Sequence, residues 1–214
     1  MLTAQAAGKA RIAVLVSGGG TNLQALIDAQ QSGALHSGEI VLVVSNRTGA
    51  FALERAERAG IPARTVTRKA NGGTQEGFEA ALLSILDEYQ PDLIVLAGFL
   101  TILSPDFARR WDRRILNVHP ALIPAFCGRD YYGLRVHEAA LARGVKLTGA
   151  TVHFVNEIPD GGEILLQKAV EVLPGDSPET LQCRVMEQAE WILLPRAIEM
   201  VAVEGITQEE RSNQ

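Results

Sequence analysis

The chain has 214 residues, of which 47% are hydrophobic and 21% charged, so it can bury the core of a single α/β domain. Its 25 acidic residues outnumber its 20 basic ones, and the formal charge of −5 argues against a nucleic-acid partner because the molecule as a whole would repel phosphates. The two cysteines have no metal-ligand spacing, and no leader or membrane-length apolar run is present, so we expect a cytoplasmic protein with neither disulfides nor a membrane partner.

Short apolar segments alternate with amphipathic ones through the first half of the chain. The apolar segments are rich in β-branched residues, which is typical of strands buried on both faces, and glycine or proline ends the helical segments between them. This alternation predicts an α/β fold with a doubly wound, mostly parallel, Rossmann-like sheet. The predicted strands cover residues 11–16, 40–44, 63–67, 92–97 and 114–118, and the predicted helices residues 21–33, 50–59, 74–89 and 104–110.

The pattern changes after His119. A long loop and a helix lead to two strands separated by Pro-Asp-Gly-Gly, which predicts an antiparallel C-terminal extension of the sheet, and a last helix runs to about Val203. The loop covers residues 120–133, the helix 134–143, and the strands 147–155 and 163–172. We expect an N-terminal extension at residues 1–10, a single domain at 11–205 with halves at 11–118 and 119–205, and a tail at 206–214.

The segment Ser-Gly-Gly-Gly-Thr-Asn at residues 17–22 joins the first predicted strand to a helix. Glycines let a ligand approach the backbone, and the free N–H groups and dipole at a helix start favour an anion. The segment lacks the Lys-Ser/Thr pair of a P-loop, and Leu23 stands where a dinucleotide fingerprint needs glycine. These residues predict a phosphate site, and the alternative is a capped turn without a ligand.

Asn117 and His119 lie at the end of the last parallel strand, where alternation places both side chains on one face. Ligands bind at that end of an open α/β sheet, and an amide donor beside an imidazole suits acyl-type transfer. Asp160 would hold the imidazole in one tautomer and raise its pKa if the fold brings them together. The alternatives are a polar pair that satisfies loop backbone and, for Asp160, a simple Asp-Gly turn.

Other candidate residues are less informative. His137 falls on an amphipathic helix and His153 within a strand. Cys127 follows His119 closely, but no helix start or orienting partner can be identified for it, which argues against a thiol nucleophile.

Four segments, taken together, carry a resemblance to a known family. They are Val-Ser-Gly-Gly-Gly-Thr-Asn-Leu-Gln-Ala at residues 16–25, Leu-Ala-Gly-Phe-Leu-Thr-Ile-Leu-Ser-Pro at 96–105, Asn-Val-His-Pro-Ala-Leu-Ile-Pro at 117–124, and Thr-Gly-Ala-Thr-Val-His-Phe-Val at 148–155 followed by Asp160-Gly-Gly. In this order, over about residues 11–200, the chain resembles the phosphoribosylglycinamide formyltransferases of de novo purine synthesis.

The resemblance implies an enzyme that transfers the formyl group of 10-formyltetrahydrofolate, its co-substrate, to the amine of 5-phosphoribosylglycinamide without a metal. It implies a monomer or homodimer that acts on small molecules, with phosphate bound by residues 11–118 and the folate and catalytic groups in residues 119–205. The implied catalytic residues are Asn117, His119 and Asp160; the implied ribonucleotide contacts are Gly20, Thr21, Asn22, Gln188 and Glu190; and the implied folate contacts are Gln75, Leu100, Thr101, Ile102, Leu103, Asn156, Glu157 and Asp160.

The chain departs from the family pattern mainly on the folate side. Gln75 and Thr101 stand where the family often has arginine, Ala121 replaces a common serine, and the loop at residues 126–133 is longer than in many members. The catalytic trio is unchanged. In the last helix, Ala189 is the alternative to Glu190 at the acidic position.

Three related activities share the Asn-x-His and Asp arrangement: methionyl-tRNA formyltransferase, formyltetrahydrofolate hydrolase and sugar-nucleotide formyltransferase. We expect the first to need a tRNA-binding domain with a basic surface, and the second an N-terminal regulatory domain, for which residues 1–10 leave no room. A non-catalytic phosphate sensor would keep the glycine loop but would have no use for the trio.

Overall fold

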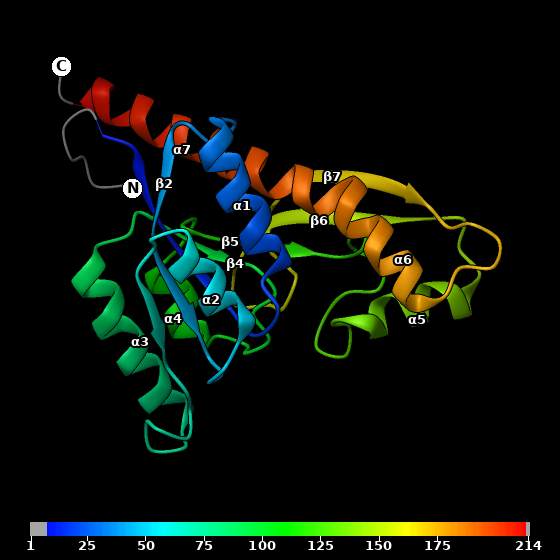
Figure 1. Ribbon diagram of the computed structural model, residues 1–214, viewed down its shortest axis with the longest axis horizontal. Coiled ribbons are helices and arrows are strands. Elements are labelled where there is room, and N and C mark those ends of the chain that lie inside the picture. Colours follow the sequence, from blue (N-terminus) through cyan, green and yellow to red (C-terminus); the bar gives the residue numbers. More distant parts are fainter. Residues whose placement is uncertain (1–7, 213–214) are drawn as a thin grey trace.

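A seven-stranded sheet forms the centre of the molecule (Figure 1). The computed structural model describes residues 8–212, with side chains through residue 203, so residues 1–7 of the expected extension lie outside the described residues. The strands are β1 (Ala10–Val16), β2 (Gly38–Ser45), β3 (Ala63–Thr65), β4 (Leu93–Leu96), β5 (Ile115–His119), β6 (Leu147–Phe154) and β7 (Ile164–Glu171). Their order is β3-β2-β1-β4-β5-β6-β7. Strands β1 to β5 are parallel to one another, β6 pairs antiparallel with β5, and β7 pairs antiparallel with β6, which confirms the predicted fold class.

Helices cover both faces of this sheet. They are α1 (Thr21–Ser32), α2 (Phe51–Arg58), α3 (Gln75–Tyr89), α4 (Pro105–Arg110), α5 (Leu134–Arg143), α6 (Pro178–Val185), a π-helical turn η1 (Met186–Glu190) and α7 (Trp191–Ser212). Strand alternation divides the core: Val14 and Val16 pack with α1, α2, α6 and α7, whereas Ala13 and Leu15 pack with α3 and α4. In the part of the chain that the structure describes, no helix is both long and apolar enough to cross a membrane.

The last helix differs from the prediction of one continuous segment to about Val203. It is interrupted by η1 and then continues to Ser212, so it covers residues 206–212 of the expected tail, and residues 213–214 lie outside the described residues. Pro195 lies in the first turns of α7 and cannot donate to the carbonyl four residues earlier, so regular helical hydrogen bonding is already weakened there. A π turn accommodates one additional residue, and such turns are frequent at functional sites.

The carboxyl ends of three neighbouring parallel strands meet at one edge of the sheet. Leu15 of β1 pairs with Leu96 of β4, and Leu96 pairs with Asn117 of β5. The loops that follow these strands therefore begin side by side. The first carries the glycine-rich segment, the second carries the residues around Leu100, and the third begins directly after His119, the last residue of β5. This edge brings together most of the residues that the sequence identified.

Candidate active site

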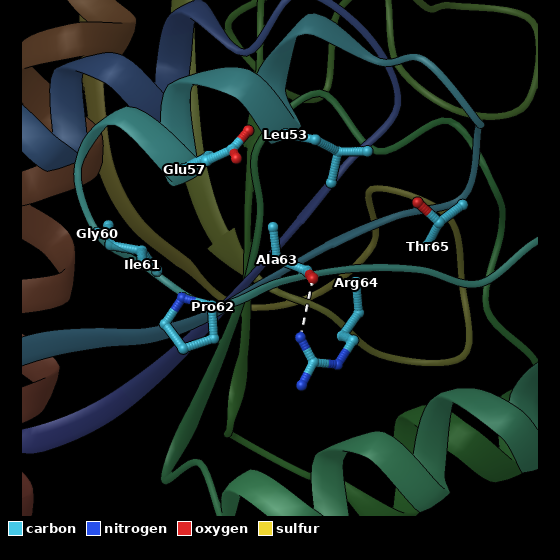
Figure 2. A pocket seen from close by; sticks show the side chains of 8 residues that line it. All are labelled: Leu53, Glu57, Gly60, Ile61, Pro62, Ala63, Arg64 and Thr65. Atoms are coloured by element: carbon cyan, nitrogen blue, oxygen red, sulfur yellow. Dashed lines mark hydrogen bonds between the residues drawn. The ribbon is translucent and has the colours of Figure 1, made fainter.

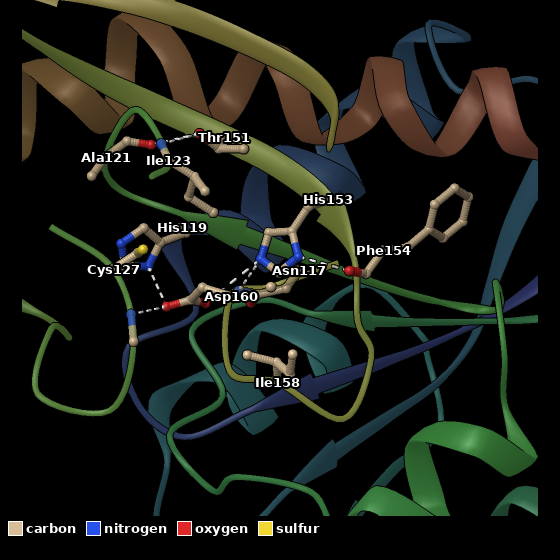
Figure 3. A network of polar contacts seen from close by, with 12 residues as sticks. Asn117, His119, Ala121, Ile123, Cys127, Thr151, His153, Phe154, Ile158 and Asp160 are labelled. Atoms are coloured by element: carbon tan, nitrogen blue, oxygen red, sulfur yellow. Dashed lines mark hydrogen bonds and ion pairs between the residues drawn. The ribbon is translucent and has the colours of Figure 1, made fainter. Parts of the chain in front are cut away.

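Asp160 lies against both Asn117 and His119 (Figure 3). Its Oδ1 is 3.5 Å from Asn117 Nδ2, and its Oδ2 is 3.6 Å from His119 Nδ1. Asn117 and His119 come from β5, whereas Asp160 comes from the loop that joins β6 and β7. The loop thus supplies a carboxylate to the pair on the strand, and the three side chains form one polar cluster.

The loop around Asp160 has an unusual backbone. Asp160 has φ 56°, in the left-handed region, and a Cβ on Gly162 would lie 1.7 Å from the Phe154 carbonyl oxygen. The N–H of Gly128 donates to Asp160 Oδ2 at 2.8 Å. Burial opposes ionisation of Asp160, but the contact with His153, the charge of His119 and the Gly128 N–H outweigh it and lower the pKa of this carboxyl.

Both ring nitrogens of His119 have partners. Nε2 donates to the Phe126 carbonyl at 2.7 Å, since a carbonyl only accepts, and Nδ1 faces Asp160. Burial lowers the pKa of His119, while Asp160 and the Phe126 carbonyl act in the opposite direction. The predicted upward effect of the carboxylate is therefore present, but the net shift is downward because the ring is buried.

His153, which the sequence did not single out, is part of the same cluster. Its Nδ1 donates to the Phe154 carbonyl at 2.8 Å, and its Nε2 lies 3.6 Å from Asp160 Oδ1 and 3.2 Å from the amide nitrogen of Asn117. This contact turns the amide nitrogen of Asn117 toward Asp160. Asn117 and His153 are direct partners across β5 and β6, and only that strand register could have identified the contact.

Thr151 anchors the loop that leaves His119. Its hydroxyl donates to the Ala121 carbonyl at 2.6 Å and accepts from the Ile123 N–H at 3.1 Å (Figure 3). Gln167 of the neighbouring strand donates to the same oxygen at 3.0 Å. Ala121 contributes its backbone here, so the alanine that replaces a common serine does not interrupt this anchoring.

The glycine-rich loop precedes α1 and is held by residues far away in sequence. Gly20 has φ 71°, and a Cβ at this position would lie 2.6 Å from Ala52 Cβ, so only glycine fits. Arg55 donates to the Gly19 carbonyl at 2.8 Å, which places a guanidinium beside the loop. No side chain caps the start of α1, so its N–H groups remain available to an anion. No sequence pattern had identified Arg55.

The π turn places Glu190 beside this loop. Asn22 Nδ2 donates to Glu190 Oε2 at 2.6 Å, and burial raises the pKa of Glu190 to about 7 although Asn22 opposes this shift. Ala189 packs in the apolar core instead, so it is Glu190 that faces the loop. Gln188 is exposed and lines a shallow cleft with Cys183. Thr21 contacts Met186 Sδ at 3.6 Å.

Exposed apolar side chains lie on two loops, one after β4 and one that carries Asp160. Leu100 and Ile102 are about half exposed on the loop between β4 and α4, and Ile158 is exposed beside Asp160. Asn156 is turned into its own loop, where it donates to the Gly161 carbonyl at 3.1 Å and accepts from the Ile158 N–H at 2.9 Å. The remaining predicted folate residues contact protein: Glu157 pairs with Arg109, Thr101 with Asn46, Gln75 with Glu79, and Leu103 packs against the core.

A separate hollow of roughly 560 Å³ lies between α2 and β3 (Figure 2). It is lined by Leu53, Glu57 and residues 60–65, and Arg64 there donates to the Ala63 carbonyl. None of the predicted site residues lines this hollow, so it is not the candidate active site.

The cluster can stabilise charge and move protons, but it contains no activated nucleophile. An amide donor, an imidazole and a carboxylate are the groups needed to support an oxyanion and relay a proton. Cys127 lies nearby and donates to the Pro124 carbonyl at 3.3 Å, and burial and Asp160 both raise the pKa of its thiol. The arrangement therefore suits direct attack by a bound amine.

Comparisons with known proteins agree with this chemistry. Residues 10–198 match the model of the formyl transferase family. The chain is 47% identical over 194 residues to the trifunctional purine biosynthetic protein adenosine-3 of Gallus gallus, covering 91% of this chain but 18% of that protein, so it spans less than a fifth of that relative's length. It is 43% identical to the phosphoribosylglycinamide formyltransferase of Escherichia coli, covering 83% of this chain and 80% of that protein. The crystal structure of glycinamide ribonucleotide transformylase 1 from Symbiobacterium toebii is 41% identical with a TM-score of 0.85, covering 92% of this chain and 89% of that one.

Proposed function

Because the chain belongs to the formyl transferase family, we propose that it transfers the formyl group of 10-formyltetrahydrofolate to the amine of 5-phosphoribosylglycinamide, a step of purine biosynthesis. The observation that carries this proposal is the meeting of Asn117, His119 and Asp160 at the sheet edge where the glycine-rich loop also begins. The protein is proposed to act in the cytoplasm on small molecules, without a metal, as a monomer or homodimer.

The chemical step follows from the groups in the cluster. The neutral amine attacks the formyl carbon, the carbonyl oxygen becomes an oxyanion, and the bond to the folate nitrogen then breaks. Asn117 donates to the oxyanion, and His119 donates once its Nε2–H turns from the Phe126 carbonyl to the substrate. Asp160 then favours the charged imidazole and opposes the effect of burial on the pKa of His119. The amine loses one proton and the folate nitrogen gains one, and His119, directly or through water, relays it.

The glycine loop is the proposed phosphate site of the ribonucleotide. The uncapped start of α1 at Gly20, Thr21 and Asn22 offers backbone N–H groups, and Arg55 adds positive charge. Glu190, held by Asn22, is placed to accept from hydroxyl groups of the sugar. Gln188, which is exposed on the same π turn, stays a proposed contact of this substrate.

The exposed apolar surface of the loops after β4 and around Asp160 is the proposed folate site. Leu100 and Ile102 expose apolar surface on the loop that follows β4, and Ile158 does so beside Asp160, and these surfaces suit a planar ring system whose formyl group reaches His119. Asn156 supports the loop that carries Asp160, and we propose that its contribution is to hold the loop that contacts the co-substrate.

The decisive experiment is to measure consumption of 10-formyltetrahydrofolate by the purified protein with and without phosphoribosylglycinamide. The proposal requires consumption only with this acceptor, and His119→Ala should abolish most of it. Consumption without acceptor would indicate a hydrolase. Formylation of methionyl-tRNA or of an amino-sugar nucleotide in its place would indicate one of the related transferases.

A further inference from the structure

Glu79 is a buried carboxylate outside the catalytic cluster, on the second turn of α3, with 9% of its surface exposed. It accepts three hydrogen bonds: from Gln75 Nε2 at 2.5 Å, from the Ser104 N–H at 2.7 Å and from the Ser104 hydroxyl at 2.6 Å. Both carboxylate oxygens are therefore used. Two of the three donors belong to Ser104, at the end of the loop that carries Leu100 and Ile102.

That loop, at residues 98–104, has no regular secondary structure and is held by side chains from other elements. The Leu100 N–H donates to the Ser17 hydroxyl at 2.8 Å, and the Ile102 carbonyl accepts from Gln75 Nε2 at 3.2 Å. Ser104 also caps α4 by accepting from the Phe107 N–H at 3.1 Å. Glu79, directly and through Gln75, thus holds the second half of the loop.

The hydrogen bonds of Gln75 indicate that it belongs to this frame. Its amide nitrogen donates to Glu79 and to the Ile102 carbonyl, and its oxygen accepts from Arg68. Both N–H groups are therefore already used inside the protein. A hydrogen bond donated by Gln75 to the co-substrate would require breaking one of these bonds, so its effect on folate is expected to pass through the loop.

A buried carboxylate favours a single conformation of its surroundings. Because water does not reach Glu79 freely, any loop conformation that moves Ser104 away leaves a buried charge without its donors, which is unfavourable. The conformation that satisfies Glu79 is also the one that presents Leu100 and Ile102 beside the catalytic edge. The loop wall is therefore preorganised before any ligand binds.

We propose that Glu79 is a positioning residue that, with Gln75 and Ser104, sets the loop wall of Leu100–Leu103 and thereby the affinity for the folate co-substrate. The inference rests on the proposed function, which it deepens by assigning folate affinity to a residue that does not contact the folate. The proposed ribonucleotide site at Gly20 lies on a different loop, which contacts the first half of the 98–104 loop through Ser17 and not the second half that Glu79 holds.

The test is equilibrium titration of wild type and variants with tetrahydrofolate and, separately, with phosphoribosylglycinamide, together with steady-state kinetics. Glu79→Gln puts an amide nitrogen where at least one donor, the Ser104 hydroxyl, already points. It should therefore weaken tetrahydrofolate binding about tenfold, equivalent to about 1.4 kcal/mol, and leave ribonucleotide binding within about twofold. The KM for 10-formyltetrahydrofolate should rise by the same factor while kcat at saturation stays within about threefold. Glu76→Gln, on the exposed face of the same helix, is the matched control and should change neither affinity.

Two further variants keep the test decisive. Glu79→Asp retains the carboxylate but shortens the side chain by one methylene, and Ser104→Ala removes the hydroxyl donor. Each variant should weaken the binding of tetrahydrofolate but not of the ribonucleotide, and by less than Glu79→Gln does. Wild-type affinity in the folded variants, or an equal loss for both ligands, would overturn the inference. If wild type binds tetrahydrofolate but transfers no formyl group, the proposed function fails while the role of Glu79 is still decided by the titrations. If wild type binds no tetrahydrofolate, both fail.

Discussion

His137 should make the fold sensitive to mild acid. It lies on α5 with 0% exposure, and both ring nitrogens lack a hydrogen-bond partner among the described residues. Burial, and secondarily the charge of His119, lower the pKa of His137 to about 4 from its ordinary value of 6.5. Between these two pH values the unfolded chain binds a proton that the folded chain does not, so the stability of the fold decreases as the pH falls from about 6.5 to about 4.

The magnitude follows from the two pKa values of His137. Each pKa unit corresponds to about 1.4 kcal/mol, so the full effect is about 3 kcal/mol, of which about 2 kcal/mol is reached at pH 5. Glu190 acts in the opposite direction, because its pKa is raised to about 7 and its contribution to stability is lost as the pH rises from about 4.5 to 7. The effect of His137 must therefore be measured as a difference between variants.

Urea unfolding of wild type and His137→Leu at several values between pH 8 and pH 5 provides that measurement. Leucine has a similar volume and does not titrate, so the free energy of unfolding of the variant relative to wild type should rise by about 2 kcal/mol over this range. His137→Gln is the control for polarity: it should be less stable than the leucine variant at every pH, with the same pH dependence. A difference between wild type and His137→Leu that stays constant from pH 8 to pH 5 would refute the reasoning.

Three other outcomes are expected. Asn117→Ala should lower kcat by roughly 100- to 1000-fold while separately titrated substrate Kd values change less than about tenfold, and a collapse of binding with kcat preserved would make Asn117 a binding residue. Asp160→Asn should lower the pKa of His119 further, as followed by NMR titration, because the carboxylate now raises it; an unchanged or higher pKa would remove the coupling. Asp176, whose pKa is lowered to about 2 mainly by the hydrogen bonds from Arg184, contributes stability above pH 3.8 that is lost as the pH falls through about 2. Arg184→Gln should therefore lower Tm at pH 5 more than at pH 2, and an equal loss at both would contradict this role.

Local chemistry was sufficient to predict the framework. Apolar segments such as residues 11–16, rich in β-branched residues and followed by glycine, favour strands buried on both faces, and Gly33 and Pro91 end helices through their own backbone properties. The period of two along β5 likewise places Asn117 and His119 on one face, as predicted, because side-chain alternation is a property of a single strand. Predictions of this kind depend on neighbours within a few residues.

Which further residues join the site depends on tertiary contacts that no local sequence pattern encodes. His153 meets Asn117 through the register of two antiparallel strands, and Arg55 reaches the glycine loop from the next helix. Glu190, rather than Ala189, faces that loop because a π turn shifts the helix by one residue. Asp160 becomes more than a turn residue only where its loop folds over β5. Each of these contacts is selected by the packing of the whole core, since register, helix rotation and loop path depend on energies summed over distant residues.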